Sequence, residues 1–162
     1  MFRAVANVGV PVLLYASSVG AYSPSDKGVP RDESWATGGI SSSTYSRHKV
    51  KVERLLDEFE ALHPAIRSVR LRPALIFKRA AASHIRELFF GSLIPRFAFE
   101  PRFLHWMIDH PSFRFQAVHG ADVAEAYRLA LFGSARGAFN LAADPVLRSG
   151  VPANTFRARK GG

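Results

Sequence analysis

An apolar run at residues 10–17, VPVLLYAS, is the feature that most limits how this chain can fold. A short continuous run of branched and aliphatic residues is typical of a strand covered on both faces, as the strands of parallel sheets are. A helical pattern follows it, and a second strand-like run, IRSVRLRPALIF, occupies residues 66–77. Strand, helix and strand in this order predict an α/β architecture built on a parallel sheet.

The helix between these two strands has recognisable ends. Ser43 or Thr44 is expected to cap its start, and Pro64 is expected to stop it after about His63. Large apolar side chains at helical spacing should form the face that packs on the sheet. That predicted face consists of Leu55, Leu56, Phe59 and Leu62.

Further elements are expected on both sides of this unit. Residues 1–8 resemble the last turns of a helix, which Gly9 would end. From Pro145 onward the chain turns polar and basic, and we expect it to fray. The elements expected in between are a helix at 83–90, an aromatic connection at 91–113, a strand at 113–119, a helix at 120–134 and a strand at 137–142.

The charge balance is strongly basic, with 22 lysines and arginines against 13 acidic residues and a net charge of +9. Such a chain can bind nucleic acid, another polyanion or a phosphate-bearing ligand. Its arginines are scattered through every segment, and the only basic run is the short tail RARKGG. Specific nucleic-acid binding is therefore not expected, and non-specific binding of a polyanion stays as a lesser alternative.

The 162 residues are enough for one domain with a real core, and they contain no cysteine. Disulfides, a thiolate nucleophile and a cysteine metal site are thereby excluded, and no metal site is expected. Pro11 interrupts the apolar stretch near the N-terminus, and no segment reaches the ~20 apolar residues of a membrane-spanning helix. We expect a cytoplasmic protein without a membrane segment.

Tyr45 and Lys49 stand four residues apart at the start of the predicted helix, so they project from one face of it. A phenol, with an ordinary pKa of about 10, is a poor base near neutral pH, but a neighbouring ammonium favours the phenolate. Tyr45 would then exchange a proton with a substrate hydroxyl or carbonyl. Ser18 follows the first strand at its carboxyl end, where α/β sheets place ligands, and would hydrogen-bond the same oxygen. The chemistry also needs a hydride donor or acceptor, which no side chain supplies.

These motifs occur in a characteristic order, which runs LLYASSVGAYSP, PRDES, YSRHK, VRLRPALIF, AVHGADVAEAYRLAL and GAFNLA. From residue 1 to about 143 the chain resembles the NAD-dependent epimerase/dehydratase family, the extended short-chain dehydrogenase/reductases. The resemblance implies Ser18, Tyr45 and Lys49 as the catalytic residues and NAD or NADP as the cofactor. Tyr45 and Lys49 would also contact that cofactor. The remaining residues expected to contact it are Ser17, Pro73 and Leu75.

One part of the family pattern is missing, because the sequence contains no G-x-x-G-x-x-G loop to bind the pyrophosphate. The chain thus resembles a C-terminal portion of a family member, and we expect it to be truncated and inactive alone. A second departure concerns the substrate. Nucleotide-sugar epimerases commonly carry an arginine four residues before the histidine of the VH element, and this chain has Phe115 there, with Arg114 one place off.

The expected fold is therefore an incomplete Rossmann-like, doubly wound α/β sheet with part of a small substrate-binding lobe. Residues 1–82 would form the C-terminal part of the cofactor domain, 83–145 the substrate-lobe segment and 146–162 a disordered basic tail. The expected partners are a small-molecule substrate, with a sugar or nucleotide sugar as the candidate, and a second copy of the chain. The alternatives to an enzyme are a non-catalytic remnant or a binding module.

Overall fold

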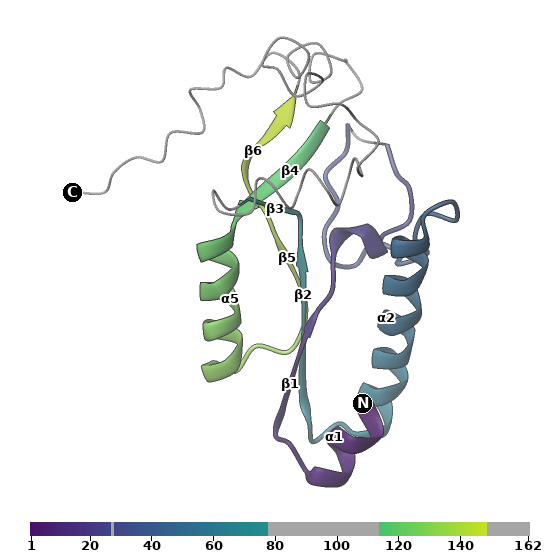
Figure 1. Ribbon diagram of the computed structural model, residues 1–162, viewed down its shortest axis with the longest axis vertical. Helices are drawn as coiled ribbons and strands as arrows, with labels where there is room; N and C mark the ends of the chain where they lie inside the picture. Colours follow the sequence, from purple (N-terminus) through teal and green to yellow (C-terminus); the bar gives the residue numbers. More distant parts are fainter. Residues whose placement is uncertain (27, 78–113, 149–162) are drawn as a thin grey trace, which may run out of the picture.

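The computed structural model describes residues 1–26, 28–77 and 114–148. Its main sheet has three parallel strands, β1 (Val12–Ala16), β2 (Arg67–Pro73) and β5 (Gly137–Leu141), in the order β1-β2-β5. Helix α2 (Thr44–Leu62) connects β1 to β2, and helix α5 (Gly120–Phe132) precedes β5. Figure 1 shows α2 and α5 on opposite sides of this sheet, so the predicted α/β fold with helices on both faces is confirmed.

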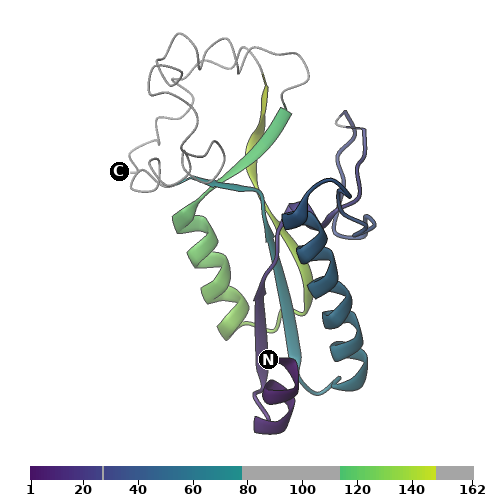
Figure 2. The same ribbon diagram turned by 45° about the vertical axis from the view of Figure 1, so that its right-hand side comes forward.

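The chain enters the sheet through a short helix, α1 (Phe2–Val8), which ends at Gly9 with a φ of 69°. Glycine suits this left-handed position because a Cβ would be strained there. Past the end of β1 the chain forms a single 3₁₀ turn, η1 (Val19–Ala21), before the loop that leads to α2. Figure 2 shows that this turn and the start of α2 lie at the same end of the sheet.

A second sheet contains β3 (Leu75–Phe77), β4 (Arg114–His119) and β6 (Ala143–Arg148) in the order β3-β4-β6. Strand β3 runs parallel to β4, and β6 runs antiparallel to it. The single strand expected at 66–77 is thus two strands in two sheets. The break falls at Ala74, whose N–H still donates to Leu141 O of β5 at 2.9 Å.

Strand β6 also differs from expectation, because the chain was predicted to fray from Pro145. It continues instead as a strand to Arg148, paired with β4 through main-chain hydrogen bonds. Such pairing does not depend on an apolar side-chain pattern, which is why the polar composition concealed it. The helix expected at 83–90 and the connection at 91–113 lie outside the described residues.

The two faces of the main sheet differ in chemistry. The face toward α5 is apolar, and Val69 and Leu71 of β2 pack there with Ala130 of α5. The side chains that alternate with them, Ser68, Arg70 and Arg72, point to the other face and are also buried. The residues packed around the apolar cluster are Leu14, Ala126, Tyr127 and Leu141.

The polar face of the sheet changes what helix α2 buries. Leu56 and Phe59 are buried as predicted, but Leu55 and Leu62 are 48% and 75% exposed. The helix turns other residues inward, among them Ser46, Val50 and Glu53. A prediction from apolar spacing alone misplaced this face because polar residues occupy part of it.

The predicted segments 1–82 and 83–145 share one sheet, since β5 pairs with β2. Within the described ranges, no helix has the length and apolar character needed to cross a membrane. In that same part of the chain, no group of three or more histidine, cysteine or carboxylate side chains is placed to hold a metal ion.

Candidate active site

Ser18 lies where the chain leaves the carboxyl end of β1. It has an extended backbone and caps the turn η1, with its Oγ accepting a hydrogen bond from Gly20 N at 3.0 Å. This bond fixes the side chain and leaves the hydroxyl proton for another acceptor. The predicted catalytic serine is thus held at the sheet edge where parallel α/β folds bind ligands.

Tyr45 belongs to the first turn of α2, and 57% of its surface is exposed. Its ring approaches Ser18 across Gly20. A methyl group added to Gly20 would lie 3.2 Å from Tyr45 Cε1 and 3.3 Å from Ser18 Oγ. The absence of a side chain at Gly20 therefore lets the phenol ring and the serine hydroxyl approach each other.

Lys49 follows one helical turn after Tyr45, as the sequence predicted. Its Nζ donates a 2.6 Å hydrogen bond to the carbonyl oxygen of Ala16 at the end of β1. The ammonium lies 5.6 Å from the centre of the Tyr45 ring and 5.3 Å from that of Tyr15. Burial raises the pKa of the Tyr15 phenol, and the charge on Glu53 raises it further, so Tyr15 stays protonated. Of the two tyrosines near Lys49, Tyr45 is the exposed one that can meet a ligand.

The predicted cofactor residues fall into two groups. Pro73 ends β2 and Leu75 begins β3, and parallel pairing of β1 with β2 puts Pro73 at the same edge as Ser18. The Ser17 hydroxyl instead donates to Glu53 at 2.5 Å, and Ser17 is only 4% exposed. A cofactor contact from Ser17 stays a prediction.

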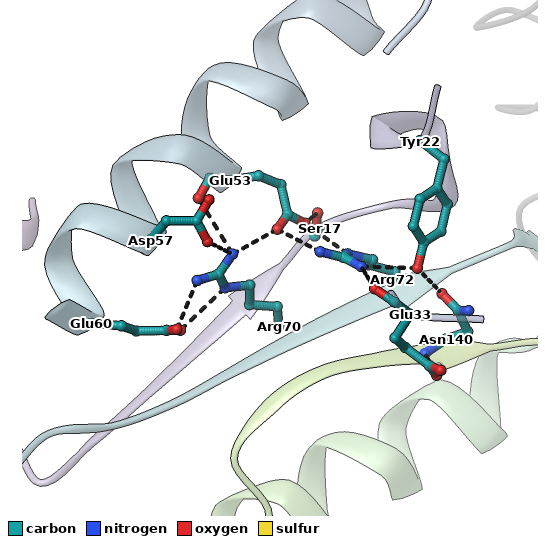
Figure 3. Close-up of polar contacts among 9 residues, drawn as sticks. All are labelled: Ser17, Tyr22, Glu33, Glu53, Asp57, Glu60, Arg70, Arg72 and Asn140. Carbon is teal, nitrogen blue, oxygen red and sulfur yellow. Dashed lines mark hydrogen bonds and ion pairs between the residues drawn. The ribbon is translucent and has the colours of Figure 1, made fainter. Parts of the chain in front are cut away.

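A buried ionic cluster that the sequence analysis did not identify lies directly behind this site (Figure 3). The Glu53 side chain is fully buried and binds Arg72 through two bonds, Arg72 Nε to Oε1 at 3.0 Å and Nη2 to Oε2 at 2.9 Å. Arg70 Nη1 donates to Oε2 at 3.0 Å. Burial alone would raise the pKa of Glu53, but hydrogen bonds from Arg72, Ser17 and Arg70 outweigh it and lower the pKa from 4.5 to about 2.

Arg70 extends the cluster along helix α2. Its Nη1 contacts Asp57 Oδ1 at 2.6 Å and its Nη2 contacts Glu60 Oε2 at 2.8 Å. The sequence carried a signal for this arrangement, since Arg70 and Arg72 alternate with Val69 and Leu71 and must share a face of the strand. Glu53, Asp57 and Glu60 have the matching helical spacing on α2.

Arg72 also joins the site to the loop that precedes α2. Its Nη1 donates to the Tyr22 hydroxyl at 2.9 Å and to the Glu33 carbonyl oxygen at 3.1 Å. The Tyr22 hydroxyl in turn donates to Asn140 Oδ1 at 2.8 Å, and Glu33 Oε1 accepts from Asn140 N at 2.7 Å. These bonds, visible in Figure 3, fasten the loop to the carboxyl ends of β2 and β5.

This fold and this grouping of side chains define the class of protein as a Rossmann-like α/β domain, and solved structures agree. UDP-glucose 4-epimerase from Thermus thermophilus in complex with NAD matches with a TM-score of 0.60 and 22% identity, over 90% of this chain and 47% of that one. UDP-N-acetylglucosamine 4-epimerase from Methanobrevibacter ruminantium, in complex with UDP-N-acetylmuramic acid, matches with a TM-score of 0.65 and 19% identity, over 90% and 46%. The chain therefore spans somewhat less than half the length of these structures.

The family is shown by a comparison of the sequence with family models. A model of the NAD dependent epimerase/dehydratase family matches residues 1–142, and the chain belongs to that family. A comparison with the curated proteins gave no match.

Proposed function

We propose that this chain provides the acid-base half of a hydride-transfer site in an NAD(P)-dependent epimerase, dehydratase or reductase. The observation that carries the proposal is that the Tyr45 ring and the Ser18 hydroxyl both lie beside Gly20, with Lys49 held at the end of the strand that precedes Ser18. Family membership supports it, and so does the complex of the Thermus thermophilus epimerase with NAD.

Each of the three residues has a role that follows from its position. Tyr45 transfers a proton to or from a substrate oxygen, because its phenol is exposed at the sheet edge. Lys49, whose Nζ lies 5.6 Å from the centre of the Tyr45 ring, places a positive charge beside the tyrosine and would contact the cofactor. Ser18 donates its hydroxyl proton to the same substrate oxygen. A bound nicotinamide would supply the hydride acceptor or donor.

The substrate we propose is a small molecule, with a sugar or nucleotide sugar as the first candidate. The support comes from relatives such as the Methanobrevibacter ruminantium enzyme in complex with UDP-N-acetylmuramic acid. Phe115 bears on the choice between a sugar and a nucleotide sugar. Its ring lies 6.4 Å from the Phe77 ring in an aromatic contact. A phenylalanine side chain at this point of β4 offers no charge to a diphosphate, so the screen should contain neutral sugars as well as nucleotide sugars.

We further propose that the 162-residue chain turns over poorly by itself. The sequence has no glycine-rich loop, so the peptide N–H groups that bind a pyrophosphate in dinucleotide sites have no counterpart in it. Nicotinamide-end contacts alone would give weak binding. We also propose a cytoplasmic location and self-association, to be checked by cell fractionation and by sedimentation of the purified chain.

The test is a fluorescence titration of the purified chain with NADH. Lys49→Ala removes the proposed ribose and phenolate contact, and Lys51→Ala is the matched control because Lys51 is exposed on the same helix. We expect saturable, weak binding that Lys49→Ala abolishes and Lys51→Ala preserves. Binding that is equal in all three proteins, or absent from the wild type, would contradict the proposed cofactor site.

A second variant tests the chemistry. In a complete enzyme that carries these residues, Tyr45→Phe should lower turnover by a factor of about 100 or more, since general acid-base catalysis contributes that much. Binding of NADH should be almost unchanged, because the ring remains. Full turnover by Tyr45→Phe would remove Tyr45 from the mechanism.

A further inference from the structure

Ser46, which follows Tyr45 in helix α2, links three separate segments of the chain. It is 2% exposed, and its hydroxyl makes two short hydrogen bonds. Ser46 Oγ donates to the carbonyl oxygen of Gly20 at 2.6 Å and accepts from the N–H of Ile40 at 2.7 Å. The hydroxyl proton thus bonds the η1 turn, and a lone pair of the same oxygen accepts a bond from the loop before the helix.

Two glycines show how closely these segments approach the helix. Gly39 has a φ of 68°, and a methyl group there would lie 2.8 Å from Ser46 Oγ and 2.6 Å from Val50 Cγ2. At Gly20 the corresponding group would lie 3.2 Å from Tyr45 Cε1. Both segments therefore lie so close to the first turns of α2 that a side chain at either glycine would crowd the helix.

We infer that Ser46 is a positioning residue for the proposed reaction. Its bond to Gly20 O fixes the turn that carries Ser18, and its place in the helix directly after Tyr45 fixes the phenol relative to that turn. The separation between the serine hydroxyl and the tyrosine ring is thereby set by one buried hydroxyl that touches neither substrate nor cofactor. The catalytic meaning of this arrangement rests on the proposed function, but the geometry is testable without it.

The experiment uses nuclear magnetic resonance on the wild-type chain and three variants. Ser46→Ala removes both bonds, and Ser46→Cys keeps the side-chain volume while weakening them. Ser43→Ala is the control, because Ser43 caps the same helix through Ser46 N without taking part in either bond of the Ser46 hydroxyl. Two signals report the geometry. They are the Overhauser contact between the Tyr45 ring and the Gly20 α-protons, and the exchange rate of the Ile40 amide.

We expect the wild type and Ser43→Ala to show the ring contact and a protected Ile40 amide. Ser46→Ala and Ser46→Cys should lose the contact, and the Ile40 amide should exchange at least about tenfold faster, while the chain stays folded by circular dichroism. Absence of the contact in the wild type, or its persistence in both Ser46 variants, would overturn the inference. If Ser46→Ala does not fold, Ser46→Cys alone decides.

The same samples separate this inference from the proposed function. A titration with NADH is run on each protein after the spectra are recorded. A wild-type chain that shows the ring contact but does not bind NADH would refute the cofactor site and leave the positioning by Ser46 intact. A wild-type chain that binds NADH but lacks the ring contact would refute the positioning by Ser46 and leave the proposed cofactor site intact.

Discussion

Replacing Glu53 with glutamine tests how much the buried ionic cluster stabilises the protein. Glu53→Gln keeps the size of the side chain but removes the charge that Arg70 and Arg72 share. In the native chain this carboxylate is fully buried and has a pKa lowered from 4.5 to about 2. Each pKa unit corresponds to ~1.4 kcal/mol, so the ionised form is favoured in the folded state by about 3 kcal/mol.

An independent argument gives a similar magnitude. Removing one partner from a buried ion pair typically destabilises a protein by about 3–5 kcal/mol, because the remaining charge stays buried without compensation. Glu53→Gln would leave the Arg72 guanidinium, whose side chain is 5% exposed, facing a neutral amide. Domains unfold with only about 5–15 kcal/mol, so such a loss is a large part of the total.

The sign of the pH dependence follows from the direction of the shift. The pKa of Glu53 is lower in the folded chain than in the unfolded chain, so its stabilising contribution is full above about pH 5. It is lost as the pH falls from there toward about 2, where the folded carboxyl also takes up a proton. The difference in unfolding free energy between wild type and Glu53→Gln should therefore be about 3 kcal/mol near neutral pH and shrink steadily in acid.

The assay is urea unfolding followed by far-ultraviolet circular dichroism across this pH range. Glu125→Gln is the matched control, because Glu125 pairs with Arg128 on an exposed surface of α5. We expect the control to follow the wild type closely, since exposed pairs contribute little. A loss below ~1 kcal/mol for Glu53→Gln near neutral pH, or a difference that does not change with pH, would refute the reasoning.

Three further substitutions have outcomes that can be measured, two by urea unfolding and one by limited proteolysis. Gly39→Ala should destabilise the chain by about 1–3 kcal/mol, and by more than Gly9→Ala. Both glycines have a φ near 70°, but of the two only Gly39 has a neighbour, Val50 Cγ2, within 3 Å of an added methyl group. Equal losses would mean that Val50 moves aside without cost. Arg67→Lys should lower the unfolding free energy by about 1–2 kcal/mol, because the guanidinium bonds two carbonyl oxygens in the last turn of α5 and a third after the helix, at Ala135, and a lysine cannot bond all three. An unchanged urea midpoint would contradict this. Tyr22→Phe should speed proteolysis of the loop before α2, because it removes the hydroxyl that joins β2 to β5, and an unchanged cleavage rate would show that the other loop contacts suffice.

Much of the fold could be read from the sequence because its signals are local. The apolar run at 10–17 gave β1, and the cap at Ser43 gave the start of α2, with Ser43 Oγ accepting from Ser46 N. The division between β2 and β3 was not predicted, because a single residue, Ala74, separates the two strands and the run of apolar residues continues across it. Strand β6 was missed for a related reason, since it is held by main-chain pairing to β4.

The positions of the candidate site residues could be predicted from the sequence, but the hydrogen bonds and ion pairs around them could not. Tyr45 and Lys49 follow from helical spacing, and Ser18 follows from its place after a strand. Ser46 carries no sequence signal, because a serine after a tyrosine looks like any other helical residue until the loop that it binds is known. The ionic cluster did leave a signal in the spacing of its charged residues, but the pairing of Glu53 could not be assigned from it, because its partners are 17 and 19 residues further along the chain.

The ionic contacts on α2 have a consequence for where Tyr45 and Lys49 lie along the sheet. An apolar helix face can slide a little along a strand, because dispersion contacts have no direction. Guanidinium–carboxylate bonds do have one, and a slip of a single turn, about 5.4 Å, would carry Glu53 out of reach of both arginines. Tyr45 precedes Glu53 by eight positions, or ~12 Å of helix. The axial position of Tyr45 is therefore fixed two turns away from it, within the buried ionic cluster.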